Sequence, residues 1–137
     1  MTKTIEQIAN HLEFLGYKTE KKVSENSKEK DFFIATHPDN NSLLFWEYLS
    51  FVSFRVNLTT PKKSPVEKLN KFIVDANKSI NISKLTYDLE ESDTCLRFNA
   101  VYAGDYSKEK YGQFYNAFEN DQRIISKVDN FQELFLN

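Results

Sequence analysis

The sequence has few of the residues on which small disulfide-bonded, zinc-binding and nucleotide-binding proteins depend. Cys95 is the one cysteine among 137 residues, so an internal disulfide is impossible and a cysteine-based zinc module is excluded. Glycine occurs three times, and none of the patterns GxGxxG, GxxxxGK(S/T) or GxSxG is present. These absences remove the common signatures of nucleotide-binding proteins and hydrolases. We therefore expect a protein that is not an enzyme and that uses no cofactor and no metal.

The chain also lacks a charge excess and a long apolar run. Its 18 Lys and Arg residues are balanced by 20 Asp and Glu residues, a net charge of −2, whereas nucleic-acid-binding domains usually carry a basic excess. The densest apolar segment, Leu43–Phe54, is interrupted by Glu47, Ser50 and Ser53, and a membrane span needs about 20 mostly apolar residues. Met1–Glu20 contains no apolar stretch of signal-peptide length. We expect no nucleic-acid or membrane partner, and a cytoplasmic location.

Aromatic residues are abundant, with 12 Phe and 7 Tyr in a chain that is 40% hydrophobic. Such a chain can offset its ordering entropy by burying apolar surface, so global disorder is excluded. The length suits one ordinary domain and is short for two. We expect a single domain over residues 1–137.

The first element is predicted to be a helix over Ile5–Leu15. Its apolar residues recur at helical spacing and form one stripe: Ile5, Ile8, Ala9, Leu12 and Leu15. Thr4 with Gln7 forms a possible capping box at its start. Gly16 stands where a C-terminal capping glycine is expected.

Strand character follows from residue 17 to residue 58. Weak alternation over Tyr17–Val23 predicts an edge strand, and Phe32–Thr36 is a short apolar strand. His37–Asn41 has turn chemistry. Leu43–Leu58 alternates clearly in its second half, but it is much longer than a usual strand of about 5–6 residues. A break or bulge is therefore expected near Leu49–Ser50.

The second half of the chain repeats the alternation of helix and strands. Ser64 is a candidate cap for a helix over Pro65–Lys78, a hairpin follows over Leu85–Tyr102, and Ser107 is a candidate cap for a long last helix. The predicted order is α-β-β-(β)-α-β-β-α. Runs of strands between helices indicate an α+β fold with an antiparallel sheet. One face of the hairpin is polar, so the helices are expected mainly on one face of the sheet.

This order of elements resembles the type III secretion chaperone-like fold and, within it, the YbjN-like family of bacterial sensory transduction regulators. The resemblance covers nearly the whole chain and rests on order and spacing. Its points of match are Phe14-Leu15-Gly16-Tyr17 at the end of the first helix, the helix Val66–Phe72, and the hairpin Leu85–Tyr102 followed by a long aromatic helix. The resemblance implies a non-enzymatic protein-binding domain that forms dimers and holds an extended segment of a partner.

Four apolar residues form the candidate partner-binding site: Leu43, Phe45, Leu49 and Phe51. In a continuous strand they lie opposite Val52, Phe54, Val56 and Leu58, so one set would pack under helices and the other would be exposed. An exposed apolar patch usually marks an interaction site. Two alternatives remain open: a bulge turns the four residues into the same core, or the apolar segment Phe131–Leu136 covers them. The first interpretation predicts a chaperone- or adaptor-like domain, with a possible homodimer, that holds an apolar segment of a partner.

The competing hypothesis is a small-molecule-binding domain or enzyme with a pocket between sheet and helices. Its expected lining is Trp46, Tyr48, Tyr102 and Phe114.

Weaker chemical signals have simpler interpretations. His37, Asp39 and Glu47 are close in sequence but too few to define a metal site, and a polar turn explains them better. Cys95 with His11 or His37 could pair a nucleophile with a base, but packing on the polar face of a strand is the preferred interpretation of Cys95.

Overall fold

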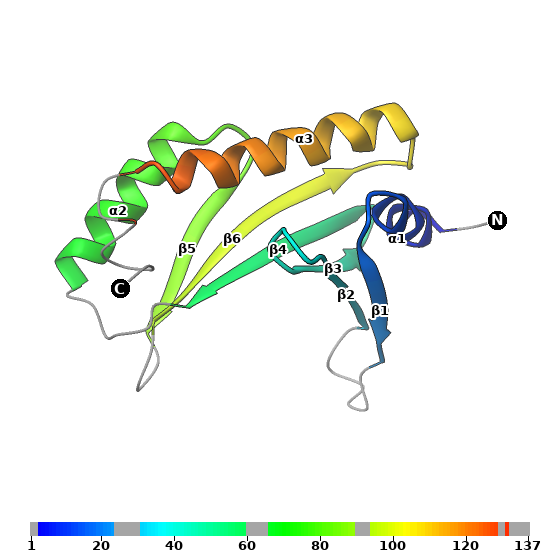
Figure 1. The fold of residues 1–137 in the computed structure, drawn as a ribbon, viewed down its shortest axis with the longest axis horizontal. Coiled ribbons are helices and arrows are strands. Elements are labelled where there is room, and N and C mark those ends of the chain that lie inside the picture. The colour runs from blue at the N-terminus through cyan, green and yellow to red at the C-terminus, as the bar shows by residue number, and fades with distance from the viewer. Residues whose placement is uncertain (1–2, 24–30, 60–65, 90–93, 129–130, 132–137) are drawn as a thin grey trace. The chain divides into compact units, whose positions relative to one another are not determined.

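The computed structural model describes residues 3–23, 31–59, 66–89, 94–128 and 131 (Figure 1). Its elements, in chain order, are α1 (Thr4–Phe14), β1 (Lys18–Lys22), β2 (Phe32–Thr36), β3 (Leu43–Tyr48), β4 (Phe51–Thr59), α2 (Val66–Ser79), β5 (Lys84–Leu89), β6 (Thr94–Ala103) and α3 (Lys108–Ile125). The strands form one open antiparallel sheet in the order β1-β2-β3-β4-β6-β5. The predicted α+β class is confirmed, with four strands between the first two helices.

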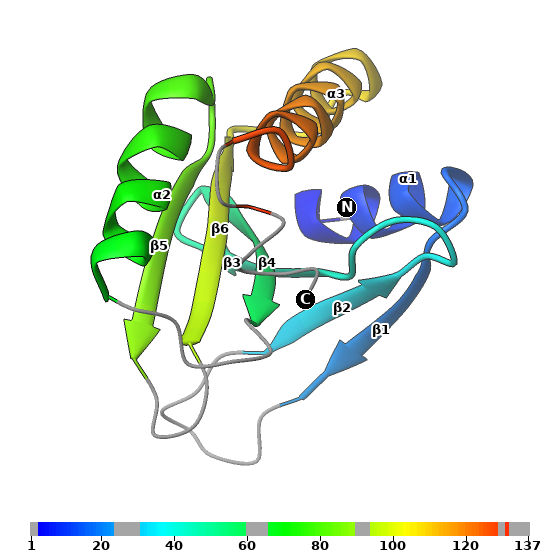
Figure 2. The same ribbon diagram turned by 60° about the vertical axis from the view of Figure 1, so that its left-hand side comes forward.

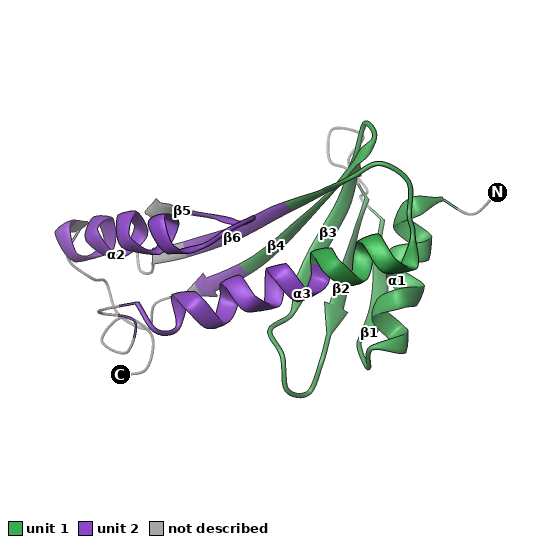
Figure 3. Cartoon of the chain, turned by 90° about the horizontal axis from the view of Figure 1, so that it is seen from above, with its two compact units in different colours: residues 1–56, 101–114 green, residues 57–100, 115–137 purple. Residues whose placement is uncertain are grey.

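The chain divides into two compact units (Figure 3). The first contains residues 1–56 and 101–114, and the second contains residues 57–100 and 115–137. Strands β4 and β6 and helix α3 each continue from one unit into the other. The single domain expected over residues 1–137 stays a prediction.

Helix α1 ends as its sequence predicts. The Gly16 N–H donates to the Glu13 carbonyl and the Tyr17 N–H donates to the Leu12 carbonyl, both at 3.0 Å. This pair of bonds, with Gly16 at φ +101°, defines a Schellman motif. The chain then turns directly into β1, and Figure 2 shows α1 against β1 and β2. As predicted, β1 is an edge strand.

The starts of two helices gave different outcomes. Ser107 caps α3, since its Oγ accepts a 3.0 Å hydrogen bond from the Lys110 N–H. The capping box predicted at Thr4 and Gln7 is wrong: Thr4 is already helical, and the N-cap is Lys3, which makes no side-chain capping bond. The cap predicted at Ser64 lies outside the described residues.

In the first unit, Tyr111 of α3 lies at the centre of an aromatic core. Its ring centroid lies 5.0 Å from that of His11 on α1, 5.9 Å from that of Phe54 on β4 and 5.5 Å from that of Tyr102 on β6. Burial raises the pKa of the Tyr111 hydroxyl well above its usual value, so this ring stays neutral. Both helical segments of this unit therefore lie on the same face of its strands, as predicted.

In the second unit, α2 and the later part of α3 pack on the β5–β6 hairpin. The rings of Phe98 and Phe118 stack at 5.1 Å. Asn77 on α2 fixes the start of β5, because its amide donates to the Leu85 carbonyl at 3.0 Å and accepts from the Leu85 N–H at 2.8 Å. The hairpin predicted over Leu85–Tyr102 is confirmed by its register.

Asp121 on α3 is a buried carboxylate that the sequence did not single out. It is fully inaccessible to solvent. Its Oδ1 accepts a hydrogen bond from the Asn81 N–H at 2.9 Å, and its Oδ2 accepts from the Ile82 and Ser83 N–H groups at 2.9 and 3.0 Å. One side chain thus accepts from three successive backbone donors of the α2–β5 connection, so neither the buried side chain nor these donors lack a partner.

Candidate functional site

The break predicted at Leu49–Ser50 is a two-residue hairpin turn. Tyr48 pairs with Phe51, and Phe45 pairs with Phe54, across β3 and β4. Cross-strand partners point to the same face. The turn therefore reverses the parity of the alternation, and odd-numbered residues of β3 share a face with even-numbered residues of β4.

This parity corrects half of the candidate partner-binding site. Leu43 and Phe45 are only 1% and 0% exposed, and Phe45 stacks on Phe54 with ring centroids 5.4 Å apart. They belong to the core, so the expectation of one exposed face carrying all four residues is wrong. Leu49 and Phe51 are exposed, at 78% and 39%. Whether either residue binds a partner stays a prediction.

Leu49 occupies an unusual backbone conformation. Its φ is +55°, and among the described residues it is the one non-glycine residue with positive φ. A β-carbon disfavours this region, and asparagine or glycine would adopt it at lower cost. The hairpin tip therefore exposes a large apolar side chain at a position whose backbone favours a different residue.

The other parity of the hairpin forms a second apolar surface. Cross-strand pairs Leu44–Arg55, Trp46–Ser53 and Tyr48–Phe51 lie opposite the buried set, and Phe32 and Ile34 extend this surface onto β2. We call it the outer aromatic face and define it by Phe32, Leu44, Trp46, Tyr48, Phe51 and Arg55. Tyr48 and Phe51 are exposed and the other four are half-buried.

The outer aromatic face contains a shallow hollow of about 330 Å³ lined by Phe32, Leu44, Trp46 and Arg55. The Arg55 guanidinium lies over the Trp46 ring, 5.0 Å from its centroid. This cation–π contact holds two large side chains together on adjacent strands. The hollow is therefore a preformed apolar surface with a cation at its wall.

The pocket of the competing hypothesis does not form. Trp46 and Tyr48 point to the outer aromatic face, whereas Tyr102 is buried in the core of the first unit and contacts Phe114 with ring centroids 5.6 Å apart. The four residues lie on opposite faces of the strands and cannot line one cavity. This expectation is wrong for the same reason: the parity reversal at the hairpin turn.

His37 has a structural role in its turn. Its Nδ1 accepts hydrogen bonds from the Asp39 N–H at 3.0 Å and the Asn40 N–H at 3.3 Å. Its ring also packs on Tyr17 at 4.9 Å. Within the described ranges, no three His, Cys, Asp or Glu side chains lie close enough together to hold a metal ion. The Cys95 side chain lies outside the described residues, although its backbone pairs with Asp88.

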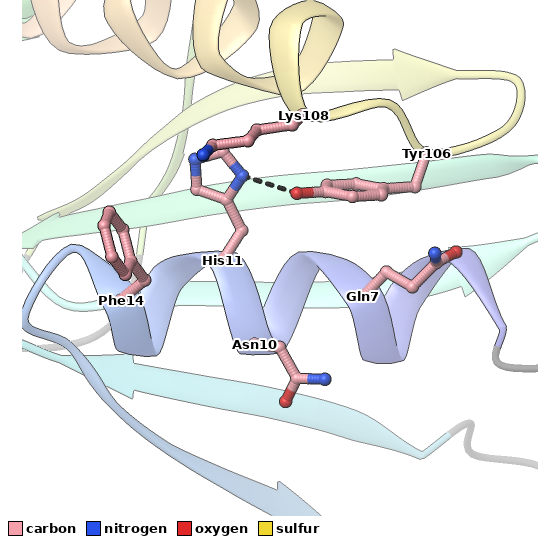
Figure 4. Close-up of a pocket in the computed structure, with 6 residues that line it drawn as sticks. All are labelled: Gln7, Asn10, His11, Phe14, Tyr106 and Lys108. Atoms are coloured by element: carbon pink, nitrogen blue, oxygen red, sulfur yellow. Dashed lines mark hydrogen bonds between the residues drawn. The ribbon is translucent and has the colours of Figure 1, made fainter.

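A second hollow lies between α1 and the start of α3. It measures about 360 Å³ and is lined by Gln7, Asn10, His11, Phe14, Tyr106 and Lys108 (Figure 4). A 2.8 Å hydrogen bond joins His11 Nδ1 to the Tyr106 hydroxyl. Burial and the nearby Lys108 charge lower the pKa of His11 below its usual value of 6.5. The sequence could not pair His11 with Tyr106, because they are separated by 95 positions.

None of the helices within the described residues is both long and apolar enough to cross a membrane. No protein-family model matches the chain, and no curated protein matches its sequence. Among solved structures, the crystal structure of YbjN from E. coli, described as a proposed transcription regulator, is similar, with a TM-score of 0.68 and 16% sequence identity. The match covers 97% of this chain and 96% of that chain, and it shows that this chain has a YbjN-like fold.

Proposed function

We propose that this protein is a non-enzymatic, adaptor-like protein-binding domain whose outer aromatic face holds an apolar segment of a partner protein. The observation that carries the proposal is the exposure of Tyr48 and Phe51 on the same face of the β3–β4 hairpin as the preformed Trp46–Arg55 hollow, with exposed Leu49 in the adjoining turn. The YbjN-like fold supports it, since YbjN is described as a proposed transcription regulator, a regulatory rather than an enzymatic role.

The composition of this face favours a protein partner. Trp, Tyr and Arg are the residue types enriched where truncation most weakens protein–protein binding, and Trp46, Tyr48 and Arg55 lie here on adjacent strands. A contiguous apolar surface on a soluble domain usually marks an interaction site. The open sheet surface and its shallow hollow suit a run of apolar side chains from one segment better than an enclosed small ligand.

The test compares capture of partners from lysate of the native host by the tagged wild-type chain and by two variants. Tyr48→Ser/Phe51→Ser removes two exposed rings of the outer aromatic face. Val74→Ser is the matched control, because Val74 is an exposed apolar residue, 51% accessible, on α2. Circular dichroism establishes that all three proteins are folded.

We expect the wild type and the Val74→Ser control to retain one protein partner at near-equal amounts. The double variant should lose at least about tenfold of this capture, since two exposed rings at an interface together contribute about 1.4 kcal/mol or more. Trp46 is the one tryptophan in the chain, so quenching or a blue shift of its fluorescence by the purified partner reports contact at the face itself. Capture of no partner, or equal capture by the double variant, contradicts the proposal.

A further inference from the structure

The hollow between α1 and α3 is separate from the outer aromatic face and combines an exposed ring with a cation. Phe14 is 81% accessible, the highest value among the large apolar residues described. The Lys108 ammonium lies 5.8 Å from the centroid of its ring. In Figure 4, Lys108 reaches over His11, Phe14 stands beside them, and the Asn10 side chain points away from them. The ring, the imidazole and the ammonium thus border one open space.

The charge in this space is unbalanced. Among the described residues that line the hollow, one is a lysine and none is an aspartate or a glutamate. Lys108 is also the first residue of α3, where the helix dipole is positive and disfavours a cation. Its charge further disfavours protonation of His11. An anion bound here would relieve both repulsions.

The remaining neighbours of His11 do not supply an anion. Tyr106 is hydrogen-bonded to the imidazole, and Tyr111 packs edge-on against it with a raised pKa that keeps its hydroxyl protonated. The one charged group that faces His11 among these contacts is Lys108. A negative ligand would therefore find aromatic surfaces and one ammonium group.

We propose that this hollow binds a small aromatic carboxylate, with the ring against Phe14 and Tyr106 and the carboxylate on Lys108. The volume of about 360 Å³ lies near the lower end of ligand pockets, roughly 300–1,000 Å³, so the ligand is small. The carboxylate makes a charge-assisted hydrogen bond to the ammonium. The ring covers apolar surface that is otherwise exposed to water.

Linkage gives this site a specific signature. Burial lowers the pKa of His11 most, and the Lys108 charge lowers it further; a carboxylate on Lys108 cancels part of that charge and thereby raises the pKa of His11. By reciprocity, affinity for the carboxylate increases as the pH falls and His11 becomes protonated. A site that does not include His11 and Lys108 would leave the pKa of His11 unchanged.

The test is a titration with benzoate followed by NMR of the histidine rings. The chain has two histidines, and His37, whose ring bonds the backbone of its own turn and does not line the hollow, is an internal control. We expect benzoate to shift the His11 signals with saturation and to raise the His11 pKa, while His37 stays unchanged. Benzamide lacks the charge and acetate lacks the ring, so both should bind at least about tenfold more weakly.

Two variants complete the test. Lys108→Gln should weaken benzoate binding about tenfold by removing the charged partner. Lys127→Gln, at an exposed lysine beyond the other end of α3, should leave it unchanged. The proposal is overturned if benzoate gives no saturable His11 shift, if it shifts His37 equally, or if Lys108→Gln binds benzoate as well as the wild type.

Discussion

Replacing Leu49 by asparagine should stabilise the fold. A non-glycine residue at positive φ costs about 1–2 kcal/mol, and asparagine tolerates this region better than leucine. The substitution also loses the favourable free energy of burying part of the leucine side chain, which is 78% exposed. Full burial of a leucine contributes about 1.5–3 kcal/mol, so the buried fifth contributes about 0.3–0.6 kcal/mol. The net expectation is a stabilisation of about 0.5–1 kcal/mol.

Urea unfolding followed by circular dichroism measures this change. With a slope of about 1–3 kcal/mol/M, the unfolding midpoint of Leu49→Asn should rise by roughly 0.2–1 M. Leu49→Val is the control, because a β-branched residue fits positive φ even less well and should lower the midpoint. A midpoint that falls for Leu49→Asn would refute the strain at this turn. The proposed function adds a second expectation: the more stable Leu49→Asn variant should bind the partner less tightly.

Three further changes test the buried Asp121 of the second unit, the Gly16 turn after α1, and His11. Asp121→Asn keeps an acceptor for two of the three backbone donors but turns an amide N–H₂ toward the third. Thermal unfolding should therefore show that the free energy of unfolding falls by about 2 kcal/mol. Asn120→Ala, at the exposed neighbouring position, is the control and should change it by less than about 0.5 kcal/mol. Gly16→Ala should lower the free energy of unfolding, measured in urea, by about 1–2 kcal/mol. The reason is that φ is +101° and the new β-carbon would lie 3.1 Å from His37 Nε2. Unchanged stability would mean that the Schellman turn does not require glycine. Because the pKa of His11 is lowered, the unfolded chain binds more protons than the folded chain as the pH falls below 6.5. This contribution to the free energy of unfolding is therefore present above pH 6.5 and is lost below it. His11→Gln should flatten the dependence of stability on pH in this range, and an identical dependence in both proteins would contradict the assignment.

Local signals in the sequence predicted local structure well. The apolar stripe of α1, Gly16 at its end and Ser107 at the start of α3 are each decided within a few residues, because caps and helical periodicity depend on near neighbours. The edge strand β1 and the β5–β6 hairpin were also recognised from short-range alternation.

Which face a residue occupies was harder to predict. Whether Leu43 and Phe45 are buried depends on the number of residues in one turn, since a two-residue hairpin and a continuous strand give opposite parities. The same choice placed Trp46 wrongly in a pocket with Tyr102. Leu49 has none of the usual turn chemistry of Asn or Gly, so the turn could be placed at Leu49–Ser50 but its type could not be recognised.

The contacts of Asp121 and of His11 with Tyr106 depend on tertiary structure alone. Asp121 accepts hydrogen bonds from backbone N–H groups 38 to 40 positions away. Since every residue except proline has a backbone N–H, the amino-acid sequence does not show which ones a side chain will bind. For such sites the available sequence signal is a single acidic residue at a position that helical periodicity places on the apolar face. Asp121 follows Phe118 by three residues on α3, and both are buried.

The parity reversal at Leu49–Ser50 also constrains how this protein can change in length. One residue added to or removed from the turn would exchange the two faces of β3, exposing Phe45 and burying Trp46 in its place. Length changes of two residues would preserve both faces. Among relatives that keep this fold, we therefore expect even-numbered length differences in the β3–β4 turn, or an odd residue accommodated by a bulge that restores the parity within one strand.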